Sequence, residues 1–122
     1  MTDATIYKIA PAALWEAAAR AGTFDGAPVD LADGYIHFST ADQLGETAAK
    51  HFADQNDLVL IAVATAPLGD ALKWEPSRGG ALFPHLYAPL PTSAAIWVRA
   101  LPLGEDGRHI FPSEAAPAGA PA

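Results

Sequence analysis

The sequence contains one unbroken apolar run of strand length, residues 58–63, and this run constrains the fold more than any other feature. Every side chain in it is aliphatic, so neither face of the segment suits contact with water. A strand of this kind is typical of the buried centre of a sheet. The run therefore predicts a central strand that the rest of the chain surrounds.

The remaining patterns predict two helices, both early in the chain, and several short strands. The helices are expected at residues 12–21, before Gly22, and at 41–52, after a capping-box pattern of Thr40 and Gln43. The other strands are expected at residues 6–9, 35–39, 72–75 and 95–101. Residues 23–32 lack a hydrophobic period and are expected to be an irregular loop. Short strands at hairpin-like spacing predict an α/β fold of the α+β type, with small, mostly antiparallel sheets.

Length and composition predict a single domain over residues 1–112, followed by a disordered Ala/Pro tail over residues 113–122. The chain has 122 residues, of which 51% are hydrophobic and 17% charged, enough to build one core. It has no cysteine, which excludes disulfides, thiolate metal sites and a cysteine nucleophile.

Charge and hydropathy narrow the range of partners. The formal net charge is -7, and an acidic chain is poorly suited to neutralise the phosphates of a nucleic acid duplex. A small ligand with phosphates stays compatible with it, because a few local donors suffice. The N-terminus lacks a signal-peptide pattern and no apolar stretch reaches the length of a membrane span, so a cytoplasmic location is expected. The oligomeric state is left open.

The first candidate site is the segment around His37. Ser39 and Thr40 follow it where a helix is expected to begin, and an imidazole, two hydroxyls and helix N–H groups together suit a phosphate, ribose or amide. The alternative is structural: Ser39 and Thr40 only cap the helix, and His37 hydrogen-bonds within the fold.

The second candidate site follows Lys73. Glu75 and His85 suit an acid–base pair. Three aromatic side chains there suit stacking on a planar ligand ring: Trp74, Phe83 and Tyr87. Arg78, before a Gly-Gly pair, is a further candidate ligand-binding residue. The alternative is that the aromatic rings belong to the core and Glu75 pairs with Arg78 at the surface.

Other chemistry has little support in the sequence. A metal site built from His37, Glu75 and His85 lacks any short histidine spacing, so no metal is expected. Phosphate-binding loops, dinucleotide fingerprints and nucleophile elbows are all absent from the sequence. His51 and His109 are expected to face solvent or to be structural.

Two blocks of residues carry a family resemblance. The run Asp-Gly-Tyr-Ile-His-Phe-Ser-Thr at 33–40 and the run Phe-Pro-His-Leu-Tyr at 83–87, together with Trp74-Glu75, resemble the bacterial domain-of-unknown-function family 952. The resemblance covers roughly residues 6–112. It implies a fold like that of the ADP-ribosyltransferases and RNA 2'-phosphotransferases, with a cleft between two small antiparallel sheets that binds NAD or an ADP-ribosylated intermediate.

The resemblance also implies roles for particular residues. Lys8 falls where those enzymes place a His or Arg, and His37 falls on the strand that faces their ligand. The third catalytic position has no clear match, and Glu75 or His85 could fill it. On this basis the catalytic candidates are His37, Glu75 and His85, and Lys8 joins the ligand-binding candidates.

Two functional hypotheses follow. In the first, the chain is an ADP-ribosyltransferase-like enzyme that uses NAD or a related nucleotide, with His37 and Ser39 holding the ribose and the nicotinamide amide. In the second, the same cleft belongs to a non-catalytic module that binds a small ligand or a protein. Both predict that His37 and His85 share one cleft, with Glu75 near one imidazole and with Trp74 and Tyr87 as walls.

Overall fold

The computed structural model describes residues 5–77 and 80–115. Three α-helices lie in these ranges: α1 (Ala12–Ala21), α2 (Pro28–Asp33) and α3 (Leu44–His51). The strands are β1 (Thr5–Pro11), β2 (Thr23–Phe24), β3 (Ile36–His37), β4 (Leu58–Ala64), β5 (Leu72–Pro76), β6 (Leu82–Leu86), β7 (Leu90–Pro91) and β8 (Ala95–Ala100). Short 3₁₀ turns lie at Ala41–Gln43, Ala66–Ala71, Thr92–Ala94 and Ser113–Ala115.

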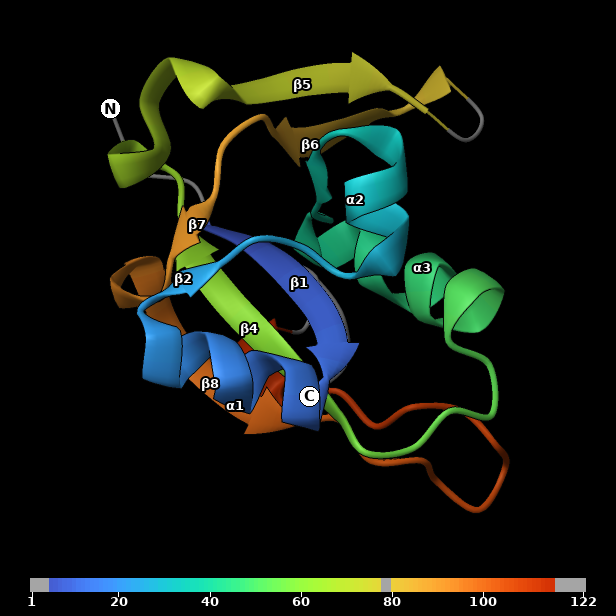
Figure 1. Cartoon of the computed structure of the whole chain (residues 1–122). Helices are drawn as coiled ribbons and strands as arrows, with labels where there is room; N and C mark the ends of the chain where they lie inside the picture. Colours follow the sequence, from blue (N-terminus) through green and yellow to red (C-terminus); the bar gives the residue numbers. More distant parts are fainter. Residues whose placement is uncertain (1–4, 78–79, 116–122) are drawn as a thin grey trace.

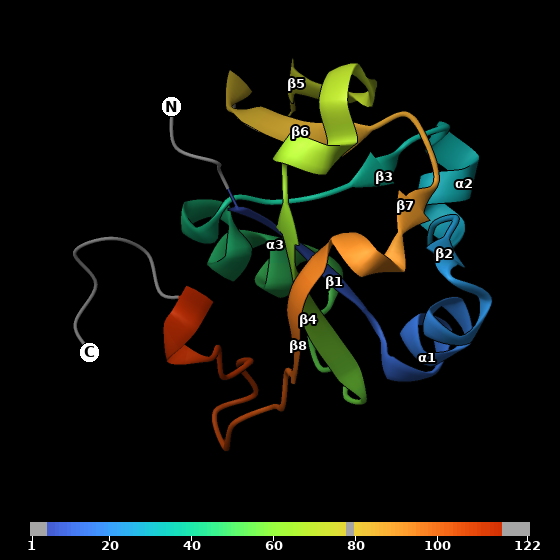
Figure 2. The same cartoon turned by 90° about the vertical axis from the view of Figure 1, so that its left-hand side faces the viewer.

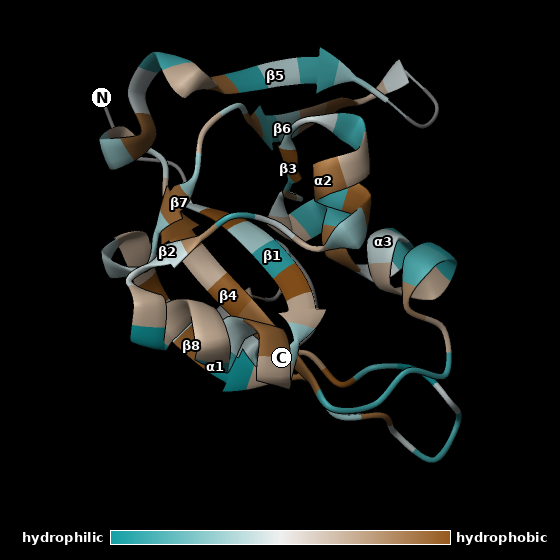
Figure 3. Ribbon diagram, in the orientation of Figure 1, coloured by the Kyte–Doolittle hydropathy of each residue, from teal (hydrophilic) through white to brown (hydrophobic). Residues whose placement is uncertain are grey.

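The predicted central strand is confirmed. β4 lies between β1 and β8 in a three-stranded antiparallel sheet, and both of its faces are covered. Ile61 and Val63 face a core that includes Trp15 of α1, whereas Leu60 faces a second core that includes Leu44 of α3. Figure 3 shows β4 in tan and brown, the hydrophobic end of the colour scale. The apolar run is thus buried because elements on both sides of the sheet pack against it.

A second three-stranded sheet, in the order β3-β6-β5, lies beside one end of the first sheet, and β2 pairs with β7 in a third (Figures 1 and 2). Each of these strand pairs is antiparallel. Tyr7 and Ser39 join the two larger sheets, since each backbone N–H donates to the carbonyl of the other at 2.8 and 2.9 Å. The α+β class expected from the sequence is confirmed.

The expected irregular loop at residues 23–32 is wrong, because this stretch contains β2 and the third helix, α2. Pro28 stands in the first turn of α2, where its missing N–H costs nothing. Gly34 follows the helix with φ 89°, the left-handed conformation that glycine adopts without strain. The helix has only six residues, too few to show an amphipathic period.

Two further boundaries differ from the prediction. No strand is predicted at residues 82–86, yet β6 forms there and includes Pro84, whose carbonyl accepts a hydrogen bond from the Phe38 N–H at 3.0 Å. The second predicted helix begins with a 3₁₀ turn and continues as α3. At its start the Gln43 side chain accepts a hydrogen bond from the Thr40 N–H at 3.0 Å, as in a capping box.

The expectation of a disordered tail from residue 113 is wrong for its first residues. Ser113–Ala115 form a 3₁₀ turn, and Ala115 is 2% exposed because it packs against the core beneath α3. Residues 116–122 of that expected tail lie outside the described residues. Within the described ranges, no helix has the length and apolar character needed to cross a membrane.

Candidate functional site

Two histidines lie side by side in one cleft, and the predicted convergence is confirmed. His37 of β3 pairs with His85 of β6 across the two strands, and their ring centroids lie 5.5 Å apart. The cleft has a volume of about 470 Å³ and is lined by side chains from β1, α2, β3, α3 and β6. Its walls therefore come from both of the larger sheets.

Tyr35 contacts both imidazoles. Its ring stacks on His85 with centroids 4.2 Å apart and an interplanar angle of 28°, and it lies 4.6 Å from His37 at a steeper angle. Burial raises the pKa of the Tyr35 phenol, and the negative charges of Asp33 and Glu75 raise it further. Tyr35 is thus a neutral aromatic ring that fixes the relative positions of the two histidines.

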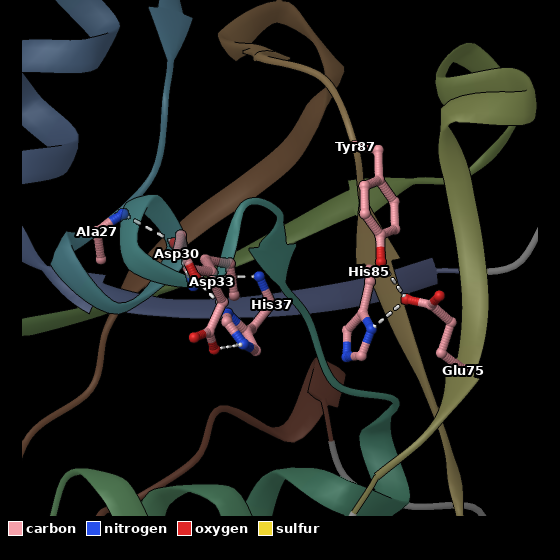
Figure 4. A network of polar contacts seen from close by, with 8 residues as sticks. Ala27, Asp30, Asp33, His37, Glu75, His85 and Tyr87 are labelled. Atoms are coloured by element: carbon pink, nitrogen blue, oxygen red, sulfur yellow. Dashed lines mark hydrogen bonds and ion pairs between the residues drawn. The ribbon is translucent and has the colours of Figure 1, made fainter.

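His37 is held by two carboxylates, one on each ring nitrogen. Its Nδ1 lies 2.6 Å from Oδ1 of Asp30, and its Nε2 lies 2.9 Å from Oδ2 of Asp33 (Figure 4). We call His37, Asp30 and Asp33 the His37 clamp. In this arrangement the ring is oriented firmly, and both of its nitrogens have a carboxylate partner.

Asp30 is the buried centre of the clamp, with 1% of its side chain exposed. Besides Nδ1 of His37, it accepts hydrogen bonds from the backbone N–H groups of Ala27 at 2.8 Å and His37 at 3.1 Å. Nζ of Lys8 lies 2.9 Å from Oδ2 and 3.0 Å from Oδ1. Burial by itself would raise the pKa of Asp30, but the His37 hydrogen bond and the Lys8 charge outweigh it and lower the pKa to about 2.

Lys8 forms the other half of this buried ion pair. Its side chain is 5% exposed, and burial lowers the pKa of its ammonium group, while Asp30 acts in the opposite direction. Lys8 contributes to the lining of the cleft, as expected for a ligand-binding candidate. Its charge, however, is neutralised by Asp30 and not directed to a ligand.

The sequence reasoning missed Asp30, and it named neither Asp33 nor Tyr35 as a site residue, although both lie in the block at 33–40. Asp30 lies in the stretch expected to be a loop, 22 residues from Lys8. A signal was present in the Pro28 and Gly34 that bracket a short helix and place Asp30 in its first turn. Asp33 is separated from His37 by four residues, a spacing at which side chains of a short turn meet.

His85 is held differently, by one carboxylate at one nitrogen. Its Nδ1 lies 2.7 Å from Oε1 of Glu75, and the phenol of Tyr87 donates to the same oxygen at 2.7 Å (Figure 4). We call His85 and Glu75 the His85 dyad. Among the described residues, Nε2 of His85 has no hydrogen-bond partner. In the neutral tautomer that donates from Nδ1 to the carboxylate, Nε2 carries the lone pair, which is the arrangement of a general base.

The two hydrogen bonds also shift the acidities of the residues around the dyad. The His85 and Tyr87 hydrogen bonds lower the pKa of Glu75. The same hydrogen bond to Glu75 raises the pKa of the Tyr87 phenol to about 12. Glu75 therefore remains a carboxylate, and Tyr87 remains a neutral donor, across the ordinary range of pH.

Some of the other predicted site residues line the cleft, and others do not. Ser39 lines the cleft, and its Oγ lies 2.9 Å from Oγ1 of Thr47, so this contact connects the segment after β3 to α3. Phe83 lines the cleft too, whereas Thr40 and Glu75 are not lining residues. Tyr87 lies behind Tyr35, with ring centroids 5.1 Å apart, and lines a smaller cavity of about 260 Å³.

The expectation that Trp74 is a wall of the cleft is wrong. Trp74 does not line it and is 43% exposed. Successive side chains of a strand point to opposite faces, so when Glu75 of β5 reaches His85, its neighbour Trp74 points away. Tyr87 is likewise not a wall of this cleft. Arg78 lies outside the described residues.

The remaining histidines do not extend the His37 clamp or the His85 dyad. His51 of α3 is exposed and contributes to the rim of the cleft. His109 is 2.9 Å from the carbonyl of Gln55 through its Nε2, a contact between two loops. In the part of the chain that the structure describes, no group of three or more His, Cys, Asp or Glu side chains is arranged to hold a metal ion.

Comparison with protein families now identifies the class of protein. Residues 9–98 match the family described as protein of unknown function (DUF952), and the chain belongs to this family. The match includes His37, Glu75 and His85, and it begins one residue after Lys8. Comparison with curated proteins gives no match.

Solved structures of one protein, CC0527 from Caulobacter crescentus, are similar to this chain. Its crystal structure is 54% identical with a TM-score of 0.84, covering 87% of this chain and 93% of that chain. A crystal structure of a double mutant of CC0527 is 52% identical, with a TM-score of 0.83 and the same coverage. Its solution NMR structure is 55% identical with a TM-score of 0.77, covering 85% of this chain and 90% of that chain.

Proposed function

We propose that the cleft binds a small ligand with a planar ring, of the class of NAD or a related nucleotide, and that His85 exchanges a proton with it. The observation that carries this proposal is the asymmetry of His85. One nitrogen is fixed by Glu75 at 2.7 Å, and the other has no partner among the described residues. A carboxylate that fixes one imidazole nitrogen leaves the second to act as a general base.

The size and lining of the cleft support a ligand of this class. A volume of about 470 Å³ lies in the range that suits a nucleoside-sized group. The lining combines aromatic rings such as Tyr35 and Phe83 with the polar edges of the two histidines. Planar rings stack on aromatic side chains, and a few convergent polar groups fix their orientation.

An ADP-ribosyltransferase-like reaction is the catalytic form of this proposal. In it, the bond between nicotinamide and the ribose breaks, nicotinamide leaves with the bonding electron pair, and an acceptor hydroxyl or amine bonds to the ribose carbon. The acceptor's proton passes to Nε2 of His85. Glu75 stabilises the imidazolium that results, since its carboxylate lies on Nδ1. The ADP-ribosyltransferase-like fold group and a bacterial, cytoplasmic setting belong to this proposal too.

A second candidate function is a non-catalytic module that binds a ligand in the same cleft. One observation favours it: Lys8 and His37, two residues that the family resemblance assigns to the ligand, are already bound to Asp30. In that function the His37 clamp is a structural unit, and His85 donates or accepts one hydrogen bond without proton transfer.

NMR titrations with NAD, ADP-ribose and nicotinamide test the proposal. We expect saturable shifts in the signals of Tyr35 and His85, and their loss in His85→Ala. His109→Ala is the matched control, because it removes an imidazole that lies outside the cleft. Chromatographic detection of released nicotinamide then separates the two functions: slow release supports transfer, and binding without release supports the module. Absence of any saturable shift with all three compounds would refute the nucleotide proposal and leave a module for another ligand or a protein.

A further inference from the structure

Asp33 occupies the outward-facing nitrogen of the His37 ring. Its Oδ2 lies 2.9 Å from Nε2 of His37, and 46% of its side chain is exposed. The imidazole itself is 32% exposed, and both residues line the cleft. The contact therefore joins a carboxylate oxygen to an imidazole nitrogen at the surface of the candidate binding site.

The two carboxylates of the His37 clamp differ sharply in how firmly they are held. Asp30 is 1% exposed and accepts hydrogen bonds from three residues, so its exchange would leave several buried donors without a partner. Asp33 makes one side-chain polar contact, to His37, within the described ranges, and solvent reaches it. Exposed ion pairs contribute little stability. Asp33 is thus the replaceable partner.

The position of Asp33 in its helix also makes the Asp33 carboxylate less stable where it lies. It is the last residue of α2, where the carbonyl groups at the end of a helix disfavour a negative charge. The compensating contact comes from outside the helix, from Nε2 of His37. An anion from solution that took over the His37 contact would release Asp33 to water at little cost.

We propose that Asp33 stands in for a ligand oxyanion: in the ligand-free protein it occupies the position on Nε2 of His37 that a phosphate oxygen of the ligand takes. Binding exchanges one anionic oxygen for another, while Asp30 keeps the ring in place from the far side. This deepens the proposed function and rests on the cleft being a ligand site. It assigns His37 to the phosphate and leaves Nε2 of His85 for the reacting group.

The exchange also explains how a cleft without a free lysine in its described lining accommodates an anion. The one lysine in the lining, Lys8, is already neutralised by Asp30. Charge-assisted hydrogen bonds from an imidazolium N–H are about twice as strong as neutral ones. A carboxylate ligand would share this chemistry, so the test must distinguish phosphate from carboxylate.

Titration with inorganic phosphate, followed through the ¹⁵N signals of the His37 ring, tests the exchange. Asp33→Asn weakens the competing acceptor and Asp33→Ala removes it, so we expect phosphate to bind about tenfold more tightly to both variants than to the unmodified chain. Glu105→Gln is the matched control, since it removes one exposed negative charge elsewhere. It should change affinity less than about twofold. Acetate is titrated in the same way, and we expect its affinity for the Asp33 variants to increase less than that of phosphate.

Three results would overturn the exchange: no gain in either Asp33 variant, an equal gain in Glu105→Gln, or a gain that persists when His37→Ala is added to Asp33→Asn. The signals of Tyr35, which lines the cleft, follow phosphate binding in the variant that lacks the His37 ring. Circular dichroism confirms that each variant is folded.

The NAD titration of the unmodified chain separates this proposal from the proposed function. If NAD shifts the His85 signals while the Asp33 variants show no gain, the exchange fails and the function stands. If phosphate shows the gain while NAD does not bind, the exchange stands and the function fails.

Discussion

The His37 clamp and the His85 dyad are two versions of the same chemical unit, an imidazole with a carboxylate on Nδ1, and they lie next to each other in one cleft. The carboxylate on Nδ1 in the clamp, Asp30, is 1% exposed, and that in the dyad, Glu75, is 36% exposed. In the clamp, the buried Asp30 also accepts hydrogen bonds from Lys8 and from the backbone N–H groups of Ala27 and His37. In the dyad, the second nitrogen is left without a partner among the described residues.

The difference in exposure shows how burial gives two similar histidine–carboxylate pairs different roles. A buried carboxylate must have all its lone pairs satisfied, so Asp30 accepts hydrogen bonds from several donors and helps to stabilise the fold. A partly exposed carboxylate can rely on water for its remaining bonds, so Glu75 can orient His85 without fixing the surrounding chain. We therefore expect changes in the clamp to affect stability, and changes in the dyad to affect chemistry.

The largest effect is expected from Asp30→Asn. The change leaves the buried Lys8 ammonium without its counter-charge, and breaking a buried pair of this kind costs about 3–5 kcal/mol in the free energy of unfolding. Urea denaturation followed by tryptophan fluorescence measures it. The double variant Lys8→Met with Asp30→Asn should recover part of the loss, because no unpaired charge is then buried. A loss below about 1 kcal/mol for the single variant would contradict the assignment of Asp30 as the centre of the clamp.

The next effect is a pH dependence that belongs to the clamp. The pKa of Asp30 is about 2 in the folded chain and 3.8 for an unperturbed aspartate. A carboxylate with a lowered pKa stabilises the fold fully above its unfolded pKa, and that contribution is lost as the pH falls through the folded value. We expect roughly 1–2 kcal/mol of stability to disappear between about pH 4 and pH 2.

Urea midpoints at a series of acidic pH values measure this loss in the unmodified chain. Asp30→Asn has no carboxylate at this position, so its midpoint should fall less steeply over the same range. Glu75→Gln is the control from the dyad, and its profile should keep the Asp30 component. Parallel profiles for the unmodified chain and Asp30→Asn would assign the acid sensitivity to other groups.

A smaller effect is expected where the two units meet, at Tyr35. Tyr35→Leu removes the ring that stacks on His85 and contacts His37 and Tyr87, and aromatic pairs of this kind contribute about 0.5–1.5 kcal/mol beyond their buried area. Tyr35→Phe keeps the ring and should be nearly neutral in the free energy of unfolding. The NMR signals of both histidine rings should move in Tyr35→Leu. Movement of one ring alone would show that the clamp and the dyad are independent.

The smallest effect on stability is expected from Glu75→Gln, which changes the dyad's chemistry instead. The pKa of Tyr87 is about 12 because its phenol donates to the Glu75 carboxylate. Without that carboxylate the pKa should fall toward the ordinary value of 10.0. Absorbance titration at alkaline pH, compared with Tyr87→Phe to identify the phenol, measures the shift. An unchanged tyrosine titration would mean that the Tyr87–Glu75 hydrogen bond does not persist in solution.

Much of the fold could be predicted from local patterns. The apolar run at 58–63 specified the central strand, and the 12–21 pattern followed by Gly22 gave both ends of α1. The small antiparallel sheets followed from short strands at close spacing. These features depend on residues near one another in the sequence, where hydrophobic period and turn chemistry act directly.

The parts that local patterns did not predict all depend on partners far along the chain. β6 forms in spite of Pro84 because β3 and β5 pair with it on both sides. Ala115 is buried because the sheet and α3 leave a surface for it to cover. Neither segment has a period of its own, so nothing in its local sequence marks it as ordered or packed.

By itself, the sequence determined the central strand, the α+β class and the two segments that carry His37 and His85. Only the tertiary structure decided how those histidines differ. Asp30 becomes the counter-charge of Lys8 because α2 and β1 meet in the fold, and a buried charge is stable only beside its partner. Glu75, at the edge of a sheet, keeps its contact with water, and that difference in burial leaves one imidazole fully bound and the other with a free nitrogen among the described residues.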